Sequence, residues 1–395
     1  MGSEEQSRQF LVRLCHFIVL VTLGICAFNV FVDPYQLFNS RTWRHINERK
    51  TTAQPEASER ALKSQDVLKE MPRSIILGTS TVDIGLDALD PGWPVSARPV
   101  YNLGLIEIDL NGSYRYLQYV LRFNRVDLVV IGIDFDQFLG RWVIPLTEQE
   151  RLRLVSASLP GRIVDFVRAS SSYDALADSL ITVTDNFLGI RSSFVAGNYP
   201  SGDRVSQRTL LGPQTWFGLI DILDLAVASK QPTSPSRIED LRAVLQLCHQ
   251  HRIKTIVLIN PTHAHLLETY SLLGYWERYE EWKRSLVSTV AEEGGDGSIT
   301  LWDFSGYDKY STLDLPDAAK WYWDPVHYTI DLGSLIVLRL FGRGDTEFGV
   351  ELLPENVSKY LEITRERQQQ YRRTHQNSVE DLRIRYEIAL KMTRG

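Results

Sequence analysis

A serine, a histidine and an aspartate in this sequence are of the types that together form a site for nucleophilic attack by the serine. Ser80 ends the apolar run Ser-Ile-Ile-Leu-Gly-Thr-Ser, and Asp324 and His327 lie three residues apart in Trp-Asp-Pro-Val-His-Tyr near the end of the chain. A serine hydroxyl is a weak nucleophile until a base removes its proton, and that base needs a carboxylate to orient it. The sequence therefore predicts Ser80 as nucleophile, His327 as general base and Asp324 as orienting acid.

The expected position of Ser80 follows from a strand pattern. An apolar run that stops at Gly78-Thr79-Ser80 is typical of a buried strand ending in a turn of small residues. Open α/β sheets hold their chemistry at the carboxyl ends of the strands, so we expect the Ser80 hydroxyl there. Structural roles are the alternatives: Ser80 as a turn residue or helix cap, Asp324 as the holder of its own turn, and His327 as a buried histidine.

Apolar segments alternate with helical patterns along the main part of the chain. The predicted strands are 74–80, 98–103, 126–133, 255–259 and 298–304, and the predicted helices are 109–123, 235–251, 275–292 and 332–341. This alternation predicts a three-layer α/β domain with a central, mainly parallel sheet. Residues 135–234 interrupt the alternation and read as an insertion, because Gly, Ser, Pro and Asn are frequent at 189–214.

The composition narrows the class of protein. A chain of 395 residues with 44% hydrophobic and 23% charged residues is typical of one large or two ordinary globular domains. A net charge of −6 without a block of Lys and Arg argues against a nucleic-acid partner. The three cysteines offer no disulfide framework, since two of them lie in the N-terminal apolar stretch.

That N-terminal stretch, residues 14–32, has the length of a membrane-spanning helix, for which roughly 20 apolar residues suffice. A signal-peptidase site after Ala27 would have Ile25 where a small residue belongs, so we predict an uncleaved anchor. Arg8 and Arg13 precede the run, which favours a cytoplasmic N-terminus. The alternative is a buried helix of a soluble protein, although the run is too evenly apolar to be amphipathic.

The chain then divides into segments of distinct character. The predicted order is a short cytoplasmic N-terminus (1–13), the anchor (14–32), a polar and turn-rich connector (33–69), the α/β domain (70–345) and a charged helical tail (346–395). The tail has no strong apolar stripe. It therefore reads as a lid, a partner-binding helix or a solvated end.

Three motifs in this order resemble the SGNH (GDSL-type) hydrolase superfamily over residues 70–345: a strand ending in Gly-x-Ser, the segment Asn102-Leu103-Gly104, and a late Asp-x-x-His. With its anchor and insertion, the chain is more specifically similar to the exported SGNH proteins of bacterial O-acylation systems. These acetylate alginate or cellulose, or take part in the D-alanylation of teichoic acid. There a multi-pass membrane acyltransferase hands the acyl group to the SGNH partner.

The resemblance implies a flavodoxin-like topology, an acyl-Ser80 intermediate and no cofactor. It places the protein at the inner membrane, with its catalytic domain in the periplasm or outside the cell. In such a site the tetrahedral oxyanion would be stabilised by the Ser80 backbone N–H and by donors from the second and third loops, near Asn102, Gly104 and Asp134.

The sequence departs from the family pattern at two positions. The second oxyanion glycine of the family would fall near Glu107, where only Gly104 is close by. The asparagine of the third block is replaced by Asp134, and a carboxylate repels an oxyanion unless it is protonated. These departures concern the oxyanion site rather than the triad.

His263, Trp323 and Tyr328 are further candidates for contact with substrate. Aromatic residues crowd the segment around the Asp-x-x-His motif and read either as core or as a face on which sugars stack, namely Trp302, Trp321, Tyr322, Trp323 and Tyr328. His263 and His265 lack a nearby carboxylate or cysteine partner in sequence, so we expect no metal site.

The expected function is extracytoplasmic, serine-dependent acyl transfer to or from a bacterial polysaccharide, with acetyl as the expected group. Whether the enzyme is a transferase or an esterase depends on whether a sugar hydroxyl or water attacks the acyl-Ser80 intermediate. The alternative is a catalytically degenerate SGNH domain that binds glycan or acts as a scaffold, which Asp134 and the missing glycine favour.

Overall fold

The computed structural model describes residues 2–34, 38, 40–48, 55–141, 143–147, 150–151, 154, 167, 170–189 and 237–394. The chain forms two compact units, one made of residues 1–65 and 148–198 and the other of residues 66–147 and 199–395. Most of the predicted insertion at 135–234, including all of 190–234, lies outside the described residues.

The larger unit is built on a six-stranded, mainly parallel sheet with the order β2-β1-β3-β4-β5-β6. Its parallel strands are β1 (Ser74–Gly78), β2 (Val100–Gly104), β3 (Leu128–Ile133), β4 (Lys254–Ile259) and β5 (Ile299–Asp303). The five predicted strands are thus confirmed. The edge strand β6 (Val350–Glu351) is antiparallel to β5 and was not predicted, because two residues carry no periodicity.

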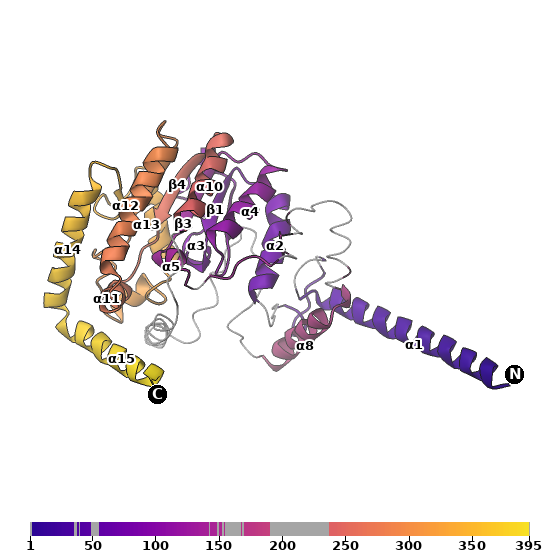
Figure 1. Cartoon of the computed structure of the whole chain (residues 1–395). Coiled ribbons are helices and arrows are strands. Elements are labelled where there is room, and N and C mark those ends of the chain that lie inside the picture. Colours follow the sequence, from indigo (N-terminus) through magenta and orange to yellow (C-terminus); the bar gives the residue numbers. More distant parts are fainter. Residues whose placement is uncertain are drawn as a thin grey trace. The chain divides into compact units, whose positions relative to one another are not determined.

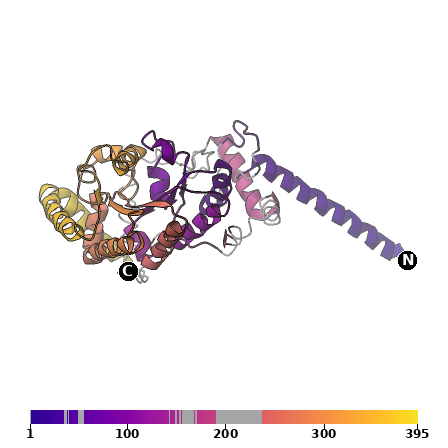
Figure 2. The same ribbon diagram turned by 90° about the horizontal axis from the view of Figure 1, so that it is seen from above.

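Helices cover both faces of this sheet (Figures 1 and 2). On one face α10 (Ile238–Gln250) packs between α4 (Leu110–Leu121) and α12 (Trp276–Glu293), and on the other α3 (Ser80–Gly85) packs against α13 (Ile330–Leu340). The central strand β3 is buried along its whole length. This explains its unbroken apolar sequence, since a strand covered on both faces has no polar side.

The order of the parallel strands, 2-1-3-4-5, is common in doubly wound α/β sheets. The chain leaves β1 for one edge, forms β2, and then crosses back to pair β3 with the other side of β1. The topological switch point therefore lies between the carboxyl ends of β1 and β3. This is the place where such sheets bind ligands.

The C-terminal helices belong to the larger unit. Tyr360 of α14 (Val357–Thr374) donates a hydrogen bond to the Ser305 carbonyl, and Arg365 forms an ion pair with Glu280 of α12. α15 (Gln376–Arg394) contacts α11 (Ala264–Leu272). The part of the predicted tail that forms α14 is therefore packed against the domain.

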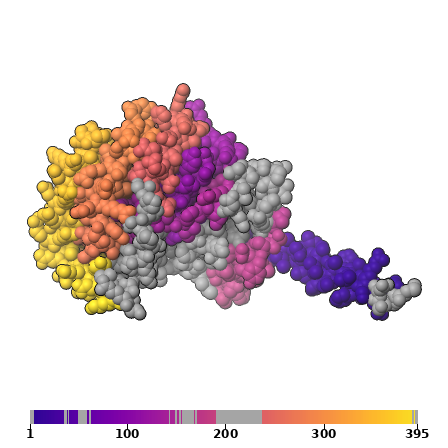
Figure 3. Space-filling model, in the orientation of Figure 1, coloured from indigo at the N-terminus to yellow at the C-terminus, as the bar shows by residue number. Residues whose placement is uncertain are grey.

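The smaller unit contains α1 (Gly2–Val32), the start of α2 (Pro55–Glu70), and α8 (Tyr173–Leu188). Residues 5–32 of α1 are long and apolar enough to cross a membrane, and most of this helix is exposed (Figure 3). In the segment predicted as a polar, turn-rich connector (33–69), the second half contains the helix α2. Pro55 is the first residue of that helix. Proline is well tolerated there, because a backbone N–H at the first helical position has no acceptor within the helix.

Candidate active site

Ser80 is the first residue of α3, immediately after the turn that ends β1. Thr79 caps the helix, since its Oγ1 accepts a hydrogen bond from the Thr81 N–H at 3.3 Å. A Cβ on Gly78 would lie 2.6 Å from the Gly132 carbonyl oxygen of β3. Only glycine therefore lets the end of β1 approach the β3 backbone this closely. The turn leaves Ser80 partly exposed at the carboxyl edge of the sheet.

The structure brings Ser80, His327 and Asp324 together. Ser80 Oγ lies 2.8 Å from His327 Nε2, and His327 Nδ1 lies 2.9 Å from both carboxylate oxygens of Asp324. A carboxylate can only accept, so Nδ1 carries the proton and Nε2 presents its lone pair to the Ser80 hydroxyl. This is the tautomer that a general base requires.

Asp324 also holds the loop that carries His327. Its Oδ1 accepts hydrogen bonds from the Val326 and His327 N–H groups, each at 2.8 Å, and the Trp323 N–H donates to the His327 carbonyl at 2.8 Å. Asp324 is completely buried and His327 is 8% exposed. The two roles that the sequence left as alternatives for Asp324, turn residue and partner of the imidazole, are thus filled by the same carboxylate.

Asp134 joins a buried network beneath these residues. Thr79 Oγ1 donates to Asp134 Oδ2 at 2.8 Å, and Asn260 Nδ2 donates to Asp134 Oδ1 at 2.9 Å. The Tyr328 hydroxyl donates in turn to Asn260 Oδ1 at 3.3 Å. The network therefore links Thr79, the neighbour of Ser80, to Tyr328, the neighbour of His327.

The Asp134 carboxyl is turned toward these partners, because both of its oxygens are engaged by them. Burial raises the pKa of Asp134 to about 6, against the pull of the Asn260 and Thr79 hydrogen bonds. Thr79 and Asn260 were not singled out in the sequence. Their positions directly after β1 and β4 could have identified them as site residues, because polar residues at the carboxyl ends of parallel strands lie at the same edge of the sheet.

Asn102 and Gly104 serve the fold rather than an open oxyanion site. The Asn102 amide donates to the Val82 and Leu86 carbonyls of the α3 segment at 2.8 and 2.7 Å, and its oxygen accepts from the Gly104 N–H at 2.9 Å. The amide groups predicted to face substrate are therefore used inside the protein. Among the described residues the Ser80 N–H has no hydrogen-bond acceptor, so it remains available as a donor beside the Ser80 hydroxyl.

Glu107 lies where the family would place its second glycine, and its backbone has a φ of 49°. This left-handed conformation is one that glycine adopts without cost. The Glu107 carbonyl accepts a hydrogen bond from the Ile144 N–H at 2.6 Å, which holds the loop.

Two of the predicted substrate contacts are buried. His263 caps α11, with Nδ1 accepting from the His265 N–H and Nε2 2.9 Å from the Leu313 carbonyl, and burial lowers the pKa of its imidazole to about 3. Tyr328 is fully buried against α3, which agrees with the core alternative for this ring. Trp323 is partly exposed next to Asp324.

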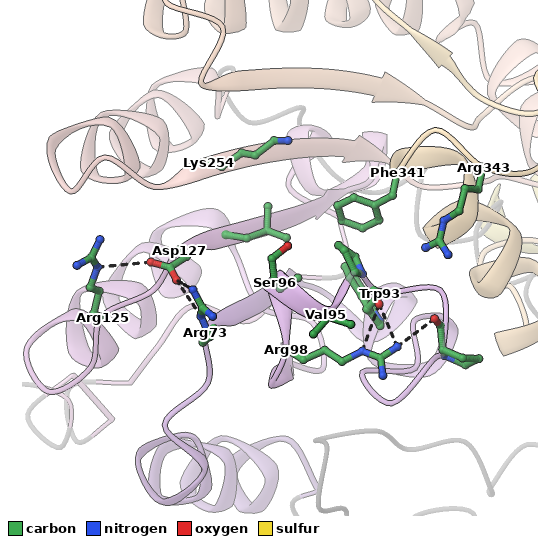
Figure 4. A pocket seen from close by; sticks show the side chains of 14 residues that line it. Arg73, Trp93, Val95, Ser96, Arg98, Arg125, Asp127, Lys254, Phe341 and Arg343 are labelled. Atoms are coloured by element: carbon green, nitrogen blue, oxygen red, sulfur yellow. Dashed lines mark hydrogen bonds and ion pairs between the residues drawn. The ribbon is translucent and has the colours of Figure 1, made fainter.

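A cavity of about 1180 Å³ lies at the opposite, amino-terminal edge of the sheet, near the first residues of β1, β3 and β4 (Figure 4). Its lining is basic and includes Arg73, Arg98, Arg125, Lys254 and Arg343. None of the triad residues borders it. The reactive edge is therefore defined by the strand ends and the hydrogen bonds, not by this hollow.

Within the described ranges, no group of three or more His, Cys, Asp or Glu side chains is placed to hold a metal ion. Comparison with known proteins finds no matching family model and no match among curated proteins or solved structures. The interpretation of this site therefore rests on its own geometry.

Proposed function

We propose that this protein is a serine-dependent acyl-transfer enzyme of the SGNH type, with Ser80 as the residue that carries the acyl group. The observation that carries the proposal is the continuous hydrogen-bond line from Ser80 through His327 to Asp324. Its members come from two elements far apart in the sequence and meet beside the switch point of the sheet.

Each group has a defined part in the reaction. As Ser80 Oγ attacks the acyl carbonyl, Nε2 of His327 takes the hydroxyl proton, and buried Asp324 stabilises the imidazolium through Nδ1–H. His327 then gives that proton to the departing oxygen, which leaves acyl-Ser80. In the second half, a water or sugar hydroxyl passes its proton to Nε2 and attacks the acyl carbon. The bond from that carbon to Ser80 Oγ then breaks, and His327 returns the proton to Oγ, which restores the free serine.

In this proposal the Ser80 backbone N–H is one hydrogen-bond donor to the oxyanion. The left-handed backbone at Glu107 supports a second loop with the shape of the SGNH pattern, although the glycine of that pattern is missing. Asp134 lies below the reacting atoms and acts through Thr79. A carboxyl with a pKa of about 6 is mostly ionised at neutral pH, and hydrogen bonds from Thr79 and Asn260 to its two oxygens disperse that charge.

The substrate and location are proposed from the resemblance and from α1. In this proposal α1 anchors the chain in the inner membrane, and the α/β domain lies in the periplasm or outside. It accepts an acetyl group from a multi-pass membrane acyltransferase and transfers it to hydroxyls of a polysaccharide, as in alginate or cellulose acetylation. A helix that can span the bilayer would keep Ser80 close to a donor in the membrane.

A second candidate function is a glycan-binding scaffold with a degenerate site. The observation that favours it is the internal use of the Asn102 amide and the Gly104 N–H, which leaves fewer oxyanion donors than a standard esterase has. A scaffold does not need Ser80 or His327 to be reactive. Measurement of ester cleavage therefore separates the two functions.

The test is cleavage of a chromogenic acetyl ester by the full chain in detergent. We expect wild type to release the chromophore and Ser80→Ala or His327→Ala to fall to the background rate, because either change removes the nucleophile or its base. Ser96→Ala is the matched control, since Ser96 is exposed at the opposite edge of the sheet. Equal release by Ser80→Ala and wild type would contradict the proposal.

A further inference from the structure

The helix α8 has its polar residues on the inside and its apolar residues on the outside. Its buried side chains are small or polar, namely Ala175, Asp178, Ser179, Thr182 and Asn186. Large apolar side chains occupy the other face, where Tyr173 is 83%, Leu180 52%, Phe187 78% and Leu188 61% exposed. The spacing of Tyr173, Leu180 and Phe187 by seven residues aligns them along one face.

Such a pattern is the reverse of that of a surface helix in a water-soluble protein. Exposed single apolar residues are ordinary, but a whole face of large ones marks contact with another molecule or with lipid. Asp174, in the first turn of α8, is also exposed, but the large exposed side chains of the helix are apolar along its whole length. We look for an apolar surrounding rather than a charged partner.

The position of α8 in the smaller unit indicates what the apolar surrounding of its exposed face is. α8 packs against α1, and burial in α1 begins only in its last two turns, from about Ile25 onward. There the Asn29 amide donates to the Ser170 carbonyl, just before α8 begins, at 2.8 Å. Phe17, Leu20 and Leu23 earlier in α1 are at least 60% exposed. α8 thus lies at the end of the apolar segment of α1, where a spanning helix leaves the bilayer core.

A second feature at the same end of α1 has the chemistry of a membrane interface. The ring of Trp43 is 42% exposed and lies 6.4 Å from the ring of Phe31. The Arg41 guanidinium stands over the Trp43 ring at 4.7 Å from its centroid. Tryptophan and tyrosine collect at the headgroup level of bilayers, and arginine there keeps its charge in water while its stem covers apolar surface.

We propose that the outward face of α8, together with Trp43, lies in the boundary between headgroups and acyl chains of the bilayer that α1 crosses. The inference rests on α1 spanning a membrane, as in the proposed function. It adds a second, interfacial contact made by a helix parallel to the bilayer surface. The ligand of this surface is phospholipid, which accommodates Tyr173, Leu180 and Phe187 without a complementary protein.

The test uses the full chain in phosphatidylcholine–phosphatidylglycerol nanodiscs, with a nitroxide label on a single cysteine. Cys15, Cys26 and Cys248 are replaced by serine or alanine, and the label is placed in turn at Leu180→Cys and Phe187→Cys. Accessibility to oxygen, which concentrates in lipid, is compared with accessibility to a water-soluble nickel complex. The lipid control is Leu20→Cys in α1, and the water control is Val95→Cys, which replaces a side chain that is 85% exposed in the larger unit.

We expect labels at 180 and 187 to resemble the label at 20, with an oxygen-to-nickel accessibility ratio several-fold above that of the label at 95. A ratio like that at 95 while position 20 stays in lipid would overturn the inference and leave the anchor intact. Labels that neither reagent reaches would also overturn it, because protein would then cover the face. A water-like label at 20 would overturn the inference and the membrane part of the proposed function together.

Discussion

At the scale of single residues, one carboxylate does two jobs that the sequence presented as competitors. Asp324 Oδ1 accepts two backbone N–H groups of its own loop and also faces His327 Nδ1. A carboxylate has room for about four hydrogen bonds, so holding the loop and accepting from the imidazole do not exclude each other. The turn that Asp324 closes is what holds the imidazole in line with Ser80.

Asp324→Asn is expected to leave the loop folded and to lower kcat for ester cleavage by about 10²- to 10⁴-fold. The asparagine oxygen can still accept the backbone N–H groups. Its NH₂ cannot accept from Nδ1, so His327 is pushed toward the tautomer that cannot take the Ser80 proton. Asp331→Asn, an exposed change in the first turn of α13, is the control for loss of charge. An unchanged kcat in Asp324→Asn would show that this carboxylate does not orient the base.

Asp134 makes stability depend on pH in a predictable direction. Its pKa is raised from 3.8 to about 6 in the folded protein, so the folded state holds a proton that the unfolded state has lost between these values. The stability that this proton contributes is present in acid and is lost as the pH rises through about 6. Asp134→Asn removes the ionisation.

We therefore expect the unfolding free energy of Asp134→Asn, relative to wild type, to rise by about 2 kcal/mol between pH 4 and pH 7, at 1.4 kcal/mol per pKa unit. Urea unfolding followed by tryptophan fluorescence measures it, with the exposed Asp317→Asn as control. A difference that is flat with pH, or that falls, would mean that Asp134 ionises freely in the folded state.

At the scale of elements, two helices on one face of the sheet fix the distance between Ser80 and His327. α3 begins at Ser80, and α13 begins three residues after His327. The helices touch where a Cβ on Gly333 would lie 1.8 Å from the Gly85 carbonyl oxygen. A side chain at this contact would force α3 and α13 apart.

Gly333→Ala is expected to destabilise the protein by about 1–3 kcal/mol and to lower ester cleavage at least tenfold at a temperature where it stays folded. Gly295→Ala is the matched control, because the nearest atom to its added methyl is the Ala291 carbonyl oxygen at 3.8 Å. If Gly333→Ala loses stability but keeps full activity, the contact does not set the Ser80–His327 distance.

Sequence patterns predict the elements whose burial produces a clear apolar periodicity, and they miss elements that are too short to show one. Strands β1, β3 and β4 are covered on both faces, which gives them apolar runs that end at readable turns. The helix α3 was missed because six residues hold less than two full turns of periodicity. Ser80 could be singled out as a polar residue after a strand, and Asp324 and His327 by their types and spacing, whereas the burial of His263 and Tyr328 depends on neighbours that only the fold supplies.

The same limit explains the Asn102 amide and the Thr79–Asp134–Asn260 network. A polar residue after a strand looks alike in sequence whether it faces substrate or bonds to a neighbouring strand end. Only the register of β1, β3 and β4 brings these side chains within hydrogen-bond distance. Sequence periodicity predicts the edge of the sheet at which these polar side chains lie, but not the hydrogen-bond partner of each one.

At the scale of the whole molecule, the chain couples an α/β unit to a unit that carries a long apolar helix. The exposed part of α1 has no packing role within the described residues, since burial starts near Ile25. Its apolar surface is therefore explained by a surrounding other than the protein itself. A bilayer fits its length.

Removal of residues 2–23 is expected to release the chain from membranes that have been washed with alkaline carbonate, while the full chain stays in the pellet. The melting transition of the truncated chain should match that of the full chain, because the turns of α1 that pack against α8 are kept. Immunoblots of the two fractions provide the measurement. Release of the full chain by the same wash would contradict the anchor.

The central claim is that His327 and Asp324 activate Ser80 to carry an acyl group, and its most direct test is the intact mass of the protein during turnover. The full chain is mixed with a chromogenic acetyl ester, quenched in acid within seconds and analysed whole and as peptides. The structure predicts a mass increase of one acetyl group, located on the peptide that contains Ser80, and its loss in Ser80→Ala and His327→Ala. Acetylation that appears elsewhere and persists in Ser80→Ala would contradict the account.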